Sequence, residues 1–505
     1  MNHNALCLDN NTSEWYVEEC MLVILNCIIC AEKGEYIMEK EVLWNNYSAE
    51  QQDEMEQVCS RYMTCLDEGK TERESARLTV RMAEEAGYQN LKDIIANGGT
   101  LKTGDKVYYM YNEKLLVMYH IGSDPLENGM NILGAHIDSP RMDVKQNPLY
   151  ENNGFAYLDT HYYGGIKKYQ WVTLPLAIHG VVIKKDGTKI DISIGEKDSD
   201  PVFTVTDLLI HLSQDQLAKT GAKVVDGEAL DLLIGSIPSA ESDSEDDKEQ
   251  KKETVTANIC RILEEQYGFE EEDFISAELE IVPAGRCREL GFDRSMIIGY
   301  GQDDRICAFT SLMALLDSET PKRTACCILV DKEEIGSVGA SGMHSKIFEN
   351  ITAEILNCMG QNDNISLRRT LQNSKMLSSD VSAAFDPLYA SVFEPKNAAF
   401  MGKGPVFNKF TGGRGKSSSS DANPEYIAEI RKLLSDHSVQ FQTAEMGKVD
   451  VGGGGTIAYI MANYGMEVID CGVAILCMHS PWEVSSKADV YETYRCYKAF
   501  IKDMK

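Results

Sequence analysis

The stretch "CCILVDKEEIGSVGAS", residues 326–341, joins an apolar run to acidic residues and a loop of small residues. The run from Cys326 to Val330 is short, partly β-branched and flanked by polar residues, which predicts a buried strand. Neighbouring residues of an extended chain point to opposite sides, so a strand rarely needs both Glu333 and Glu334 in one environment. Two explanations are open: a solvated acidic loop, or carboxylates presented at the end of a strand.

Four other segments end an apolar run in the same way. They deliver His136 after "MNILGA", His479 after "GVAILCM", Asp380 in "KMLSSD", and Asp303 with Asp304 in "MIIGYGQDD". In open α/β sheets, sites form in the crevice beyond the carboxyl ends of the strands. The pattern therefore predicts an α/β fold with a polar site at one edge of its sheet.

Each of these signals is weak when it is taken alone. A single histidine at a strand end is more often structural, and one aspartate of the pair Asp303–Asp304 could cap the helix that "DDRICAFTSLMALL" predicts. In "HID", His136 and Asp138 share one face of an extended chain, so the carboxylate can orient the imidazole of a metal ligand. Together, two histidines and several carboxylates match the ligand set of two divalent cations, which also needs a bridging carboxylate.

Competing chemistries have less support. The chain contains no G-x-S-x-G nucleophile motif. The glycine-rich "VDVGGGGTIAYI" at 449–460, which includes Gly454, lacks the lysine of a phosphate-binding loop and is better suited to close backbone approach to a ligand or a strand. The segment "TGGRGKSSSSD" at 411–421 is typical of a flexible loop.

Composition narrows the class of protein. The chain has 505 residues, of which 43% are hydrophobic and 25% charged, as in soluble globular proteins of two or three domains. A formal net charge of −30 argues against nucleic acid and anionic membranes as partners. The 15 cysteines are scattered, and several adjoin apolar runs, which favours buried free thiols in a reducing compartment such as the cytoplasm.

The pattern of elements predicts an insertion. Residues 1–37 read as an N-terminal extension, disordered or not part of the native protein, because Met38 is a sensible start of the domain. The apolar run 21–30 within them is too short to span a bilayer. An α/β pattern occupies 38–139 and 293–505. Between these parts, 140–292 contains many short strands and includes the mobile acidic loop 241–253. A compact β-rich insert within a discontinuous α/β domain fits this order.

Six motifs in this order resemble the aspartyl-aminopeptidase-like family, family eighteen of the metallopeptidases, and most closely its bacterial aminopeptidase branch. They are "GAHIDSPRMDVK", "YGG", "GYGQDDRICAFTSL", "DKEEIGSVGASG", "MLSSDVSAAFDP" and "AILCMHSPWEV". The resemblance runs from about residue 45 to the end of the chain. It implies an open mixed sheet sandwiched by helices, of the zinc-aminopeptidase (phosphorylase/hydrolase-like) type. It also implies that the insert is a dimerisation and lid domain of a homo-oligomer built from dimers, often a dodecamer.

The resemblance further implies a dinuclear metal-dependent aminopeptidase that removes the N-terminal residue of peptides with a free N-terminus. It implies five ligands for two divalent cations, most often zinc with manganese or cobalt as alternatives: His136 and Asp380 for the second metal, Glu334 and His479 for the first, and Asp304 as the bridge. Glu333 matches the general base that takes a proton from a metal-activated water, and Asp138 matches the residue that orients His136. Asp303 is a second candidate for the bridging ligand, but the helix that follows at "RICA" favours Asp304.

The sequence departs from the family pattern in the substrate pocket. Asp207, with His211 four residues on, stands where eukaryotic members carry a histidine that reaches a neighbouring subunit's active site. Asn408 stands where aspartyl-specific members carry a lysine, and Lys409 follows one residue late. Lys409, Asp207 and Gly454 are the candidate substrate contacts, and the departures favour broad or neutral N-terminal residues over strictly acidic ones.

Two alternatives stay open at this point. The same fold also supports metal-dependent carboxypeptidases and amide deacylases. A catalytically silent scaffold protein could also keep the same metal-site residues. None of the residues that match metal ligands, nor Glu333, is missing from the chain.

Overall fold

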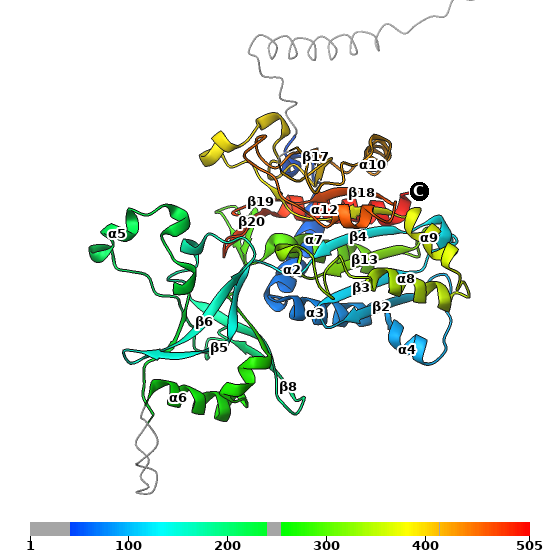
Figure 1. Ribbon diagram of the computed structural model, residues 1–505. Helices are drawn as coiled ribbons and strands as arrows, with labels where there is room; N and C mark the ends of the chain where they lie inside the picture. Colours follow the sequence, from blue (N-terminus) through cyan, green and yellow to red (C-terminus); the bar gives the residue numbers. More distant parts are fainter. Residues whose placement is uncertain (1–40, 240–253, 414) are drawn as a thin grey trace, which may run out of the picture. The chain divides into compact units, whose positions relative to one another are not determined.

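The computed structural model describes residues 41–239, 254–413 and 415–505, and the segment Val42–Lys505 forms one compact unit (Figure 1). The predicted extension 1–37 and the acidic loop 241–253 lie outside the described residues. Within these ranges, no helix combines the length and the apolar character that crossing a bilayer requires.

A nine-stranded mixed sheet forms the centre of the α/β part. Its strands, in spatial order, are β1 (Gln89–Asn90), β2 (Lys106–Tyr111), β3 (Leu115–His120), β13 (Ala325–Val330), β4 (Asn131–His136), β14 (Lys375–Ser378), β18 (Glu467–Gly472), β16 (Val406–Asn408) and β17 (Gln442–Thr443). The four central strands, β13, β4, β14 and β18, run parallel to one another, whereas β3 and β16 pair antiparallel to their inner neighbours. The expected open mixed sheet is confirmed.

Helices cover both faces of this sheet (Figure 1). Their bounds are α2 (Ala49–Glu68), α3 (Glu72–Glu85), α4 (Leu91–Ala96), α7 (Gln302–Leu316), α8 (Ile347–Cys358), α9 (Asn364–Gln372), α10 (Pro424–Asp436), α11 (Ala458–Ala462) and α12 (Lys487–Asp503). Capping boxes begin α2 at Ser48 and α3 at Thr71.

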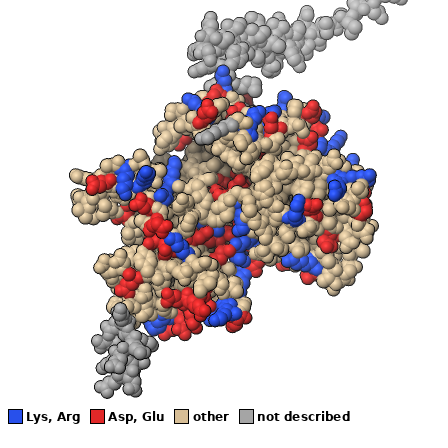
Figure 2. Space-filling model, in the orientation of Figure 1, with Lys and Arg blue, Asp and Glu red and all other residues tan. Residues whose placement is uncertain are grey.

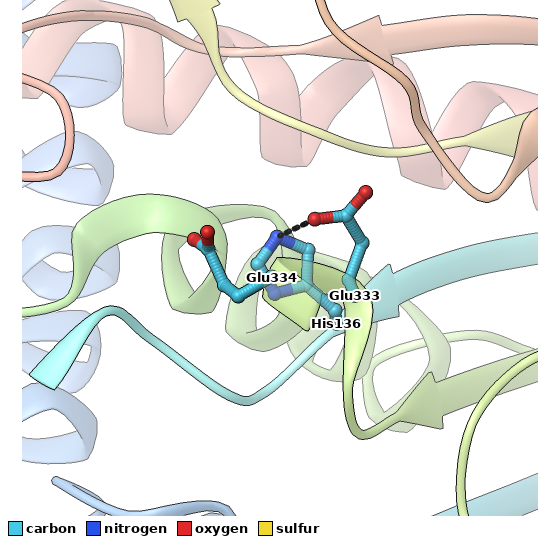
Figure 3. A group of neighbouring side chains, drawn as sticks. All are labelled: His136, Glu333 and Glu334. Carbon is cyan, nitrogen blue, oxygen red and sulfur yellow. Dashed lines mark ion pairs between the residues drawn. The ribbon is translucent and has the colours of Figure 1, made fainter. Parts of the chain in front are cut away.

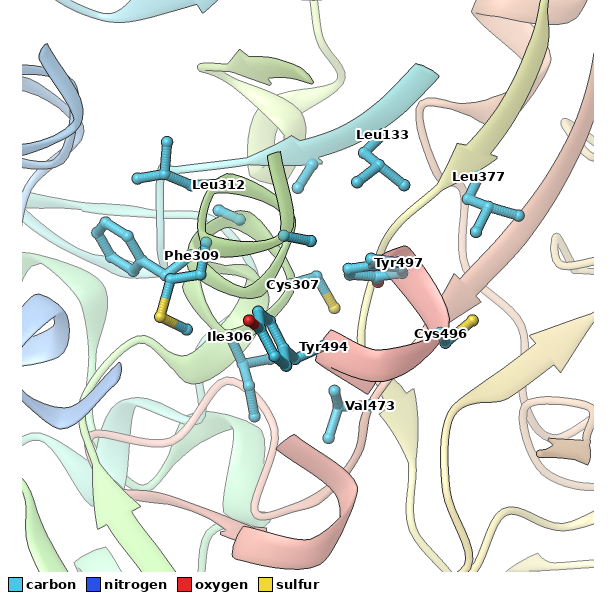
Figure 4. Packing of buried hydrophobic residues seen from close by; sticks show 14 of the residues in the cluster. Leu133, Ile306, Cys307, Phe309, Leu312, Leu377, Val473, Tyr494, Cys496 and Tyr497 are labelled. Atoms are coloured by element: carbon cyan, nitrogen blue, oxygen red, sulfur yellow. The ribbon is translucent and has the colours of Figure 1, made fainter. Parts of the chain in front are cut away.

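The apolar run of β13 divides between two cores. Cys327 and Leu329 pack with α2, α7 and α12, whereas Cys326, Ile328 and Val330 pack with α8 and α11. Figure 4 shows part of the first core, where residues of α7 and α12 meet Leu133 and Leu377 of the sheet. A strand that is buried on both faces needs apolar side chains at every position, which explains why this run shows no alternation.

The second sheet has six strands, and all of its pairs are antiparallel. In spatial order these are β8 (Lys189–Ile194), β7 (Leu176–Ile183), β10 (Ala277–Pro283), β5 (Arg141–Asn152), β6 (Phe155–Tyr163) and β9 (Leu232–Gly235). Every strand comes from residues 141–283, as do the helices α5 (Gln214–Leu217) and α6 (Val255–Ile262), and the sheet has its own apolar core.

A third, five-stranded sheet holds segments that lead into or out of the polar site. Its order is β11 (Arg288–Leu290), β12 (Met296–Gly299), β20 (Glu483–Ser486), β19 (Ala474–Leu476) and β15 (Ser382–Ala383). β12 ends shortly before Asp303, β15 begins shortly after Asp380, and β19 ends shortly before His479. Three of the candidate ligands therefore lie beside the ends of strands of this sheet.

Candidate metal centre and active site

The adjacent glutamates lie on a tight turn directly after β13. Extended geometry ends at Val330, Lys332 adopts a left-handed conformation (φ 72°, ψ 15°), and Glu333–Ile335 form a single 3₁₀ turn. Because the chain is no longer extended, both carboxylates can reach the same cleft. Figure 3 shows them on either side of the His136 ring.

Asp138 anchors this turn. Its Oδ1 accepts a hydrogen bond from the main-chain N–H of Glu333 at 3.1 Å, and its Oδ2 accepts one from that of Glu334 at 3.2 Å. The Nδ1 of His136 donates to the main-chain carbonyl of Asp138 at 3.0 Å and lies 3.3 Å from its Oδ1. Asp138 therefore contacts His136 as expected, and it also holds the backbone of both glutamates.

One aspartate lies between the two histidines. The Nε2 of His136 is 3.3 Å from Oδ1 of Asp303, and the Nε2 of His479 is 3.3 Å from Oδ2 of the same residue. The sequence-based expectation placed Asp304 at this position, and the structure corrects it to Asp303. Both residues have non-helical backbone angles before the regular part of α7, so their side chains diverge, and Asp304 lies fully buried beside Cys307.

Two groups of possible ligands share Asp303. One contains His136, Asp303 and Asp380, and the other contains Asp303, Glu334 and His479; within each group the ligand atoms lie within 4.8 Å of one another. The Nε2 of His136 is 3.9 Å from Asp380, and the Nε2 of His479 is 3.6 Å from Glu334. The structure thus brings together four of the five expected ligands and adds Asp303.

The donor atoms suit divalent cations. Three buried atoms of this cluster have no hydrogen-bond partner: Nε2 of His136, Oδ1 of Asp303 and Oε1 of Glu334. The Nδ1 atoms of His136 and His479 each contact a main-chain carbonyl, which can only accept, so each Nδ1 carries a proton. In the neutral rings, this leaves both Nε2 lone pairs directed at Asp303, the arrangement that metal-binding histidines adopt.

The carboxylates perturb one another strongly. Burial, together with the charges of Asp138 and Asp303, raises the pKa of Glu333 to about 7. Burial and neighbouring carboxylates also raise the pKa values of Glu334 and Asp380 well above their usual range. Burial lowers the pKa of His479, but its hydrogen bond to Asp303 and the nearby charges outweigh this and raise it to about 10. A cluster with this excess of negative charge is stabilised by bound cations.

A cavity of about 640 Å³ opens onto the cluster, and its lining includes Asp303, Glu333, Glu334, Asp380 and His479. Figure 2 shows acidic side chains within a hollow on the face turned to the reader. The cleft is large enough for the end of a peptide, and the candidate ligands form its floor.

Comparison with known proteins places this geometry in a family. Residues 65–501 match the family "Aminopeptidase I zinc metalloprotease (M18)". The chain belongs to the M18 family. A curated relative, probable M18 family aminopeptidase 1 of Clostridium acetobutylicum, is 58% identical over 470 residues, which are 93% of this chain and 100% of the relative.

Solved structures agree with this membership. Aminopeptidase I from Clostridium acetobutylicum is 57% identical with a TM-score of 0.85, and the match covers 92% of this chain and 100% of that one. The M18 aminopeptidase from Thermotoga maritima is 43% identical with a TM-score of 0.86 over 92% of this chain and 99% of that one. The chain is therefore a metal-dependent aminopeptidase of the M18 fold, and the predicted family, fold class and enzyme class are confirmed.

The three predicted substrate contacts of this M18 chain lie in different places, and only one of them lines the cavity. Gly454 lines the cavity, as does Asn408, which is buried and donates to the carbonyl of Ala444. Lys409 lies outside that cavity, and its Nζ pairs with Asp421 at 2.6 Å. Asp207 is exposed on a loop and accepts hydrogen bonds from the main-chain N–H of Leu208 and the side chain of Gln216, away from the cavity of its own chain.

Reasoning from the sequence missed Glu483. This fully buried carboxylate accepts hydrogen bonds from the main-chain N–H groups of Asp303, at 3.0 Å, and His479, at 2.8 Å. It therefore ties together two of the candidate ligands that come from distant parts of the chain. Its position four residues after His479, inside "MHSPWEV", was the available signal.

Proposed function

We propose that this aminopeptidase binds two divalent cations, zinc in the native protein, in the two ligand groups that share Asp303. His136 and Asp380 would hold one cation, and Glu334 and His479 the other. The observation that carries the proposal is the position of Asp303, whose two oxygens each lie 3.3 Å from a different histidine Nε2. Imidazole and carboxylate ligands suit zinc, and manganese or cobalt could replace it.

We assign the role of general base to Glu333. When bound, the cations supply Lewis acidity, which favours deprotonation of water and polarises a peptide carbonyl. Glu333 lines the cavity, and its Oε2 lies 3.9 Å from Nε2 of His136, at the edge of the ligand cluster. It accepts a proton from the attacking water and returns it to the leaving amine. Asp138 keeps Glu333 in place through its main-chain N–H.

We infer that a free N-terminal amine binds among the carboxylates of the cluster, which restricts cleavage to the first residue. The test compares hydrolysis of free and N-acetylated peptides of the same sequence, with chelator and with zinc, manganese or cobalt restored. We expect activity only on free termini, loss of activity with chelator, and two metal ions per chain after reconstitution. Cleavage of acetylated peptides would favour a deacylase or carboxypeptidase, and fewer than one metal per chain would favour a silent scaffold.

We further propose that the enzyme accepts a broad range of N-terminal residues or prefers neutral ones, and that it is not specific for acidic ones. Asn408 lines the cavity where a lysine would read an acidic side chain, and Lys409 points to Asp421 instead. Among the described residues of the lining, Lys167 is the only lysine or arginine, and it is exposed. A panel of aminoacyl-anilides tests this: hydrolysis of the aspartyl substrate at ten times the rate of the leucyl substrate would contradict it.

We propose the domain division given above, with 38–139 and 293–505 as the peptidase domain and 140–292 as the dimerisation and lid domain of a cytoplasmic homo-oligomer. The confinement of the six-stranded sheet to 141–283 supports the division. Exposed leucines and isoleucines near Asp207 support assembly, namely Leu208, Leu209, Ile210, Leu212 and Leu217. The S. cerevisiae mApe1 structure, 18% identical, is a dodecamer. The described cysteines are free thiols, which fits the cytoplasm.

A further inference from the structure

The segment Tyr163–Gly165, the "YGG" at the end of β6, contacts Asp138, which orients His136, and lies against the two candidate ligands Glu334 and His479. It belongs to the six-stranded sheet, whereas the candidate ligands come from the α/β part of the chain. We propose that this segment is a positioning element, which fixes the ring of His479 and the turn of Glu333 and Glu334 and leaves no room for side chains beside them. The inference rests on the proposed function, because it concerns the same metal ligands.

Tyr163 acts through Asp138. Its hydroxyl donates to Oδ2 of Asp138 at 2.8 Å, the same oxygen that accepts from the main-chain N–H of Glu334. Without this donor, one hydrogen bond to a fully buried carboxylate is lost, and the carboxylate that orients the glutamate turn is less firmly held. Tyr163 does not touch the cleft floor itself, so it is a positioning residue.

A buried arginine holds Tyr163 in turn. The guanidinium carbon of Arg141 lies 4.0 Å from the centre of the Tyr163 ring, within the range of a cation–π contact. Arg141 is buried and pairs with Glu72 at 3.2 Å and with Glu280 at 3.1 Å. The position of the phenol is therefore determined by groups from α3, β5 and β10, and not by the ligands themselves.

Gly165 acts on the other histidine. Its carbonyl accepts a hydrogen bond from Nδ1 of His479 at 2.8 Å, which fixes the proton on Nδ1 and directs Nε2 at Asp303. The side chain of His479 is 36% exposed, so packing alone does not determine its orientation. The main-chain oxygen of Gly165 supplies that orientation.

The two glycines are required by the ligands that they face. A Cβ at Gly165 would lie 3.3 Å from Nδ1 of His479. A Cβ at Gly164 would lie 3.2 Å from Oε2 and 3.3 Å from Cβ of Glu334, and Gly164 also has a positive φ of 73°. Both contacts are tighter than ordinary packing, so an alanine at either position would displace a ligand or the segment itself.

The experiment compares Tyr163→Phe and Gly165→Ala with Tyr162→Phe as the matched control. Tyr162 precedes Tyr163 on β6 and is 42% exposed. Zinc is titrated into metal-free protein of each variant by calorimetry, kcat and KM are measured on a leucyl-anilide, and thermal unfolding of the metal-free protein reports folding. Loss of a residue that orients metal ligands costs about 10–100-fold in metal affinity or activity.

We expect Tyr163→Phe to lower kcat about 10–100-fold with KM within about twofold of wild type. Gly165→Ala should weaken one of the two zinc-binding steps by a similar factor and leave the other within about threefold. Tyr162→Phe should change neither kcat nor the zinc affinities. Unfolding of metal-free Tyr163→Phe should match wild type, because only one oxygen is removed.

Wild-type kcat and zinc affinities in Tyr163→Phe would overturn the proposal, even if Gly165→Ala failed to fold. Equal weakening of both zinc steps by Gly165→Ala would also contradict it. Failure of the proposed function has a different signature, because wild-type protein would then bind fewer than two zinc ions in the same titration.

Discussion

Glu333 and Glu334 are neighbours that face different partners. The Oε2 of Glu333 lies 3.9 Å from His136, whereas a carboxylate oxygen of Glu334 lies 3.6 Å from His479. The left-handed Lys332 makes this possible, because it turns the chain before the pair. One residue can then hold a cation while the other exchanges a proton with water.

Glu333→Gln should retain zinc and lose turnover. The amide cannot accept the proton of water, so we expect kcat to fall by about 10²–10⁴-fold, the usual contribution of a general base. Metal content by atomic emission should equal that of wild type. Glu425→Gln, at an exposed position in the first turn of α10, serves as the control. Near-normal peptidase activity of Glu333→Gln would reject the assignment.

Asp303 and Asp304 should respond differently to the same change. Asp303→Asn removes the charge that faces both histidines, so we expect both zinc-binding steps to weaken by at least about tenfold. Asp304→Asn leaves that carboxylate in place and should weaken zinc binding less. Calorimetric titration of metal-free protein measures both, and a larger loss in Asp304→Asn would restore Asp304 as the bridge.

At the level of elements, α3 is tied to the six-stranded sheet by buried charges. His179 of β7 contacts Glu74 of α3 through Nδ1 at 2.8 Å and Glu196 through Nε2 at 3.0 Å. The Nζ of Lys70, just before α3, also pairs with Glu196 at 2.6 Å. The second oxygen of Glu74 caps α3 itself by accepting from the main-chain N–H of Thr71. A single glutamate thus caps the N-terminus of α3 and joins this helix to the six-stranded sheet.

This contact makes stability depend on pH. Burial lowers the pKa of His179, but hydrogen bonds to Glu196 and Glu74 outweigh this and raise it to about 9. The folded value is above that of the unfolded chain, about 6.5. The stabilisation is therefore complete below about pH 6.5 and is lost as the pH rises through 9.

We expect the free energy of unfolding of wild type to fall by up to about 3 kcal/mol relative to His179→Gln between pH 6.5 and 9.5. Denaturant unfolding at several pH values measures this difference. Parallel pH curves for the two proteins would show that His179 is not charged in the fold.

At the scale of the whole molecule, the site needs both large sheets. The nine-stranded and five-stranded sheets supply the candidate ligands, and the end of β6 supplies contacts to Asp138 and His479. The same six-stranded sheet carries the exposed apolar loop around Ile210. The exposed apolar loop and the segment that faces the ligands therefore lie in the same β-rich part of the chain.

Assembly is tested by light scattering. Twelve chains of 56.3 kDa should give a particle of about 680 kDa. Ile210→Asp places a charge where the side chain is 67% exposed in the single chain, so it should shift the mass toward smaller species without changing the zinc stoichiometry. An unchanged particle, or a wild-type protein that runs as a monomer, would contradict this role of the loop.

The sequence by itself determined the fold class, the family and the strand ends that carry chemistry. Unbroken apolar runs such as Cys326–Val330 predict strands buried on both faces, and the polar residues that follow them must meet at one edge of a parallel sheet. The segments therefore identify the site before any coordinates are known.

Only the tertiary structure decided which atoms meet. Asp303 and Asp304 are chemically identical in the sequence, and their backbone angles determine which of them lies between His136 and His479. Lys409 was a candidate because of one residue of register, and it points to Asp421. Tyr163, Gly165 and Glu483 contact Asp138, His479 and Asp303 across 25 to 314 positions of sequence, and two of these contacts use main-chain atoms. The motifs that contain these residues therefore do not show which atoms they touch.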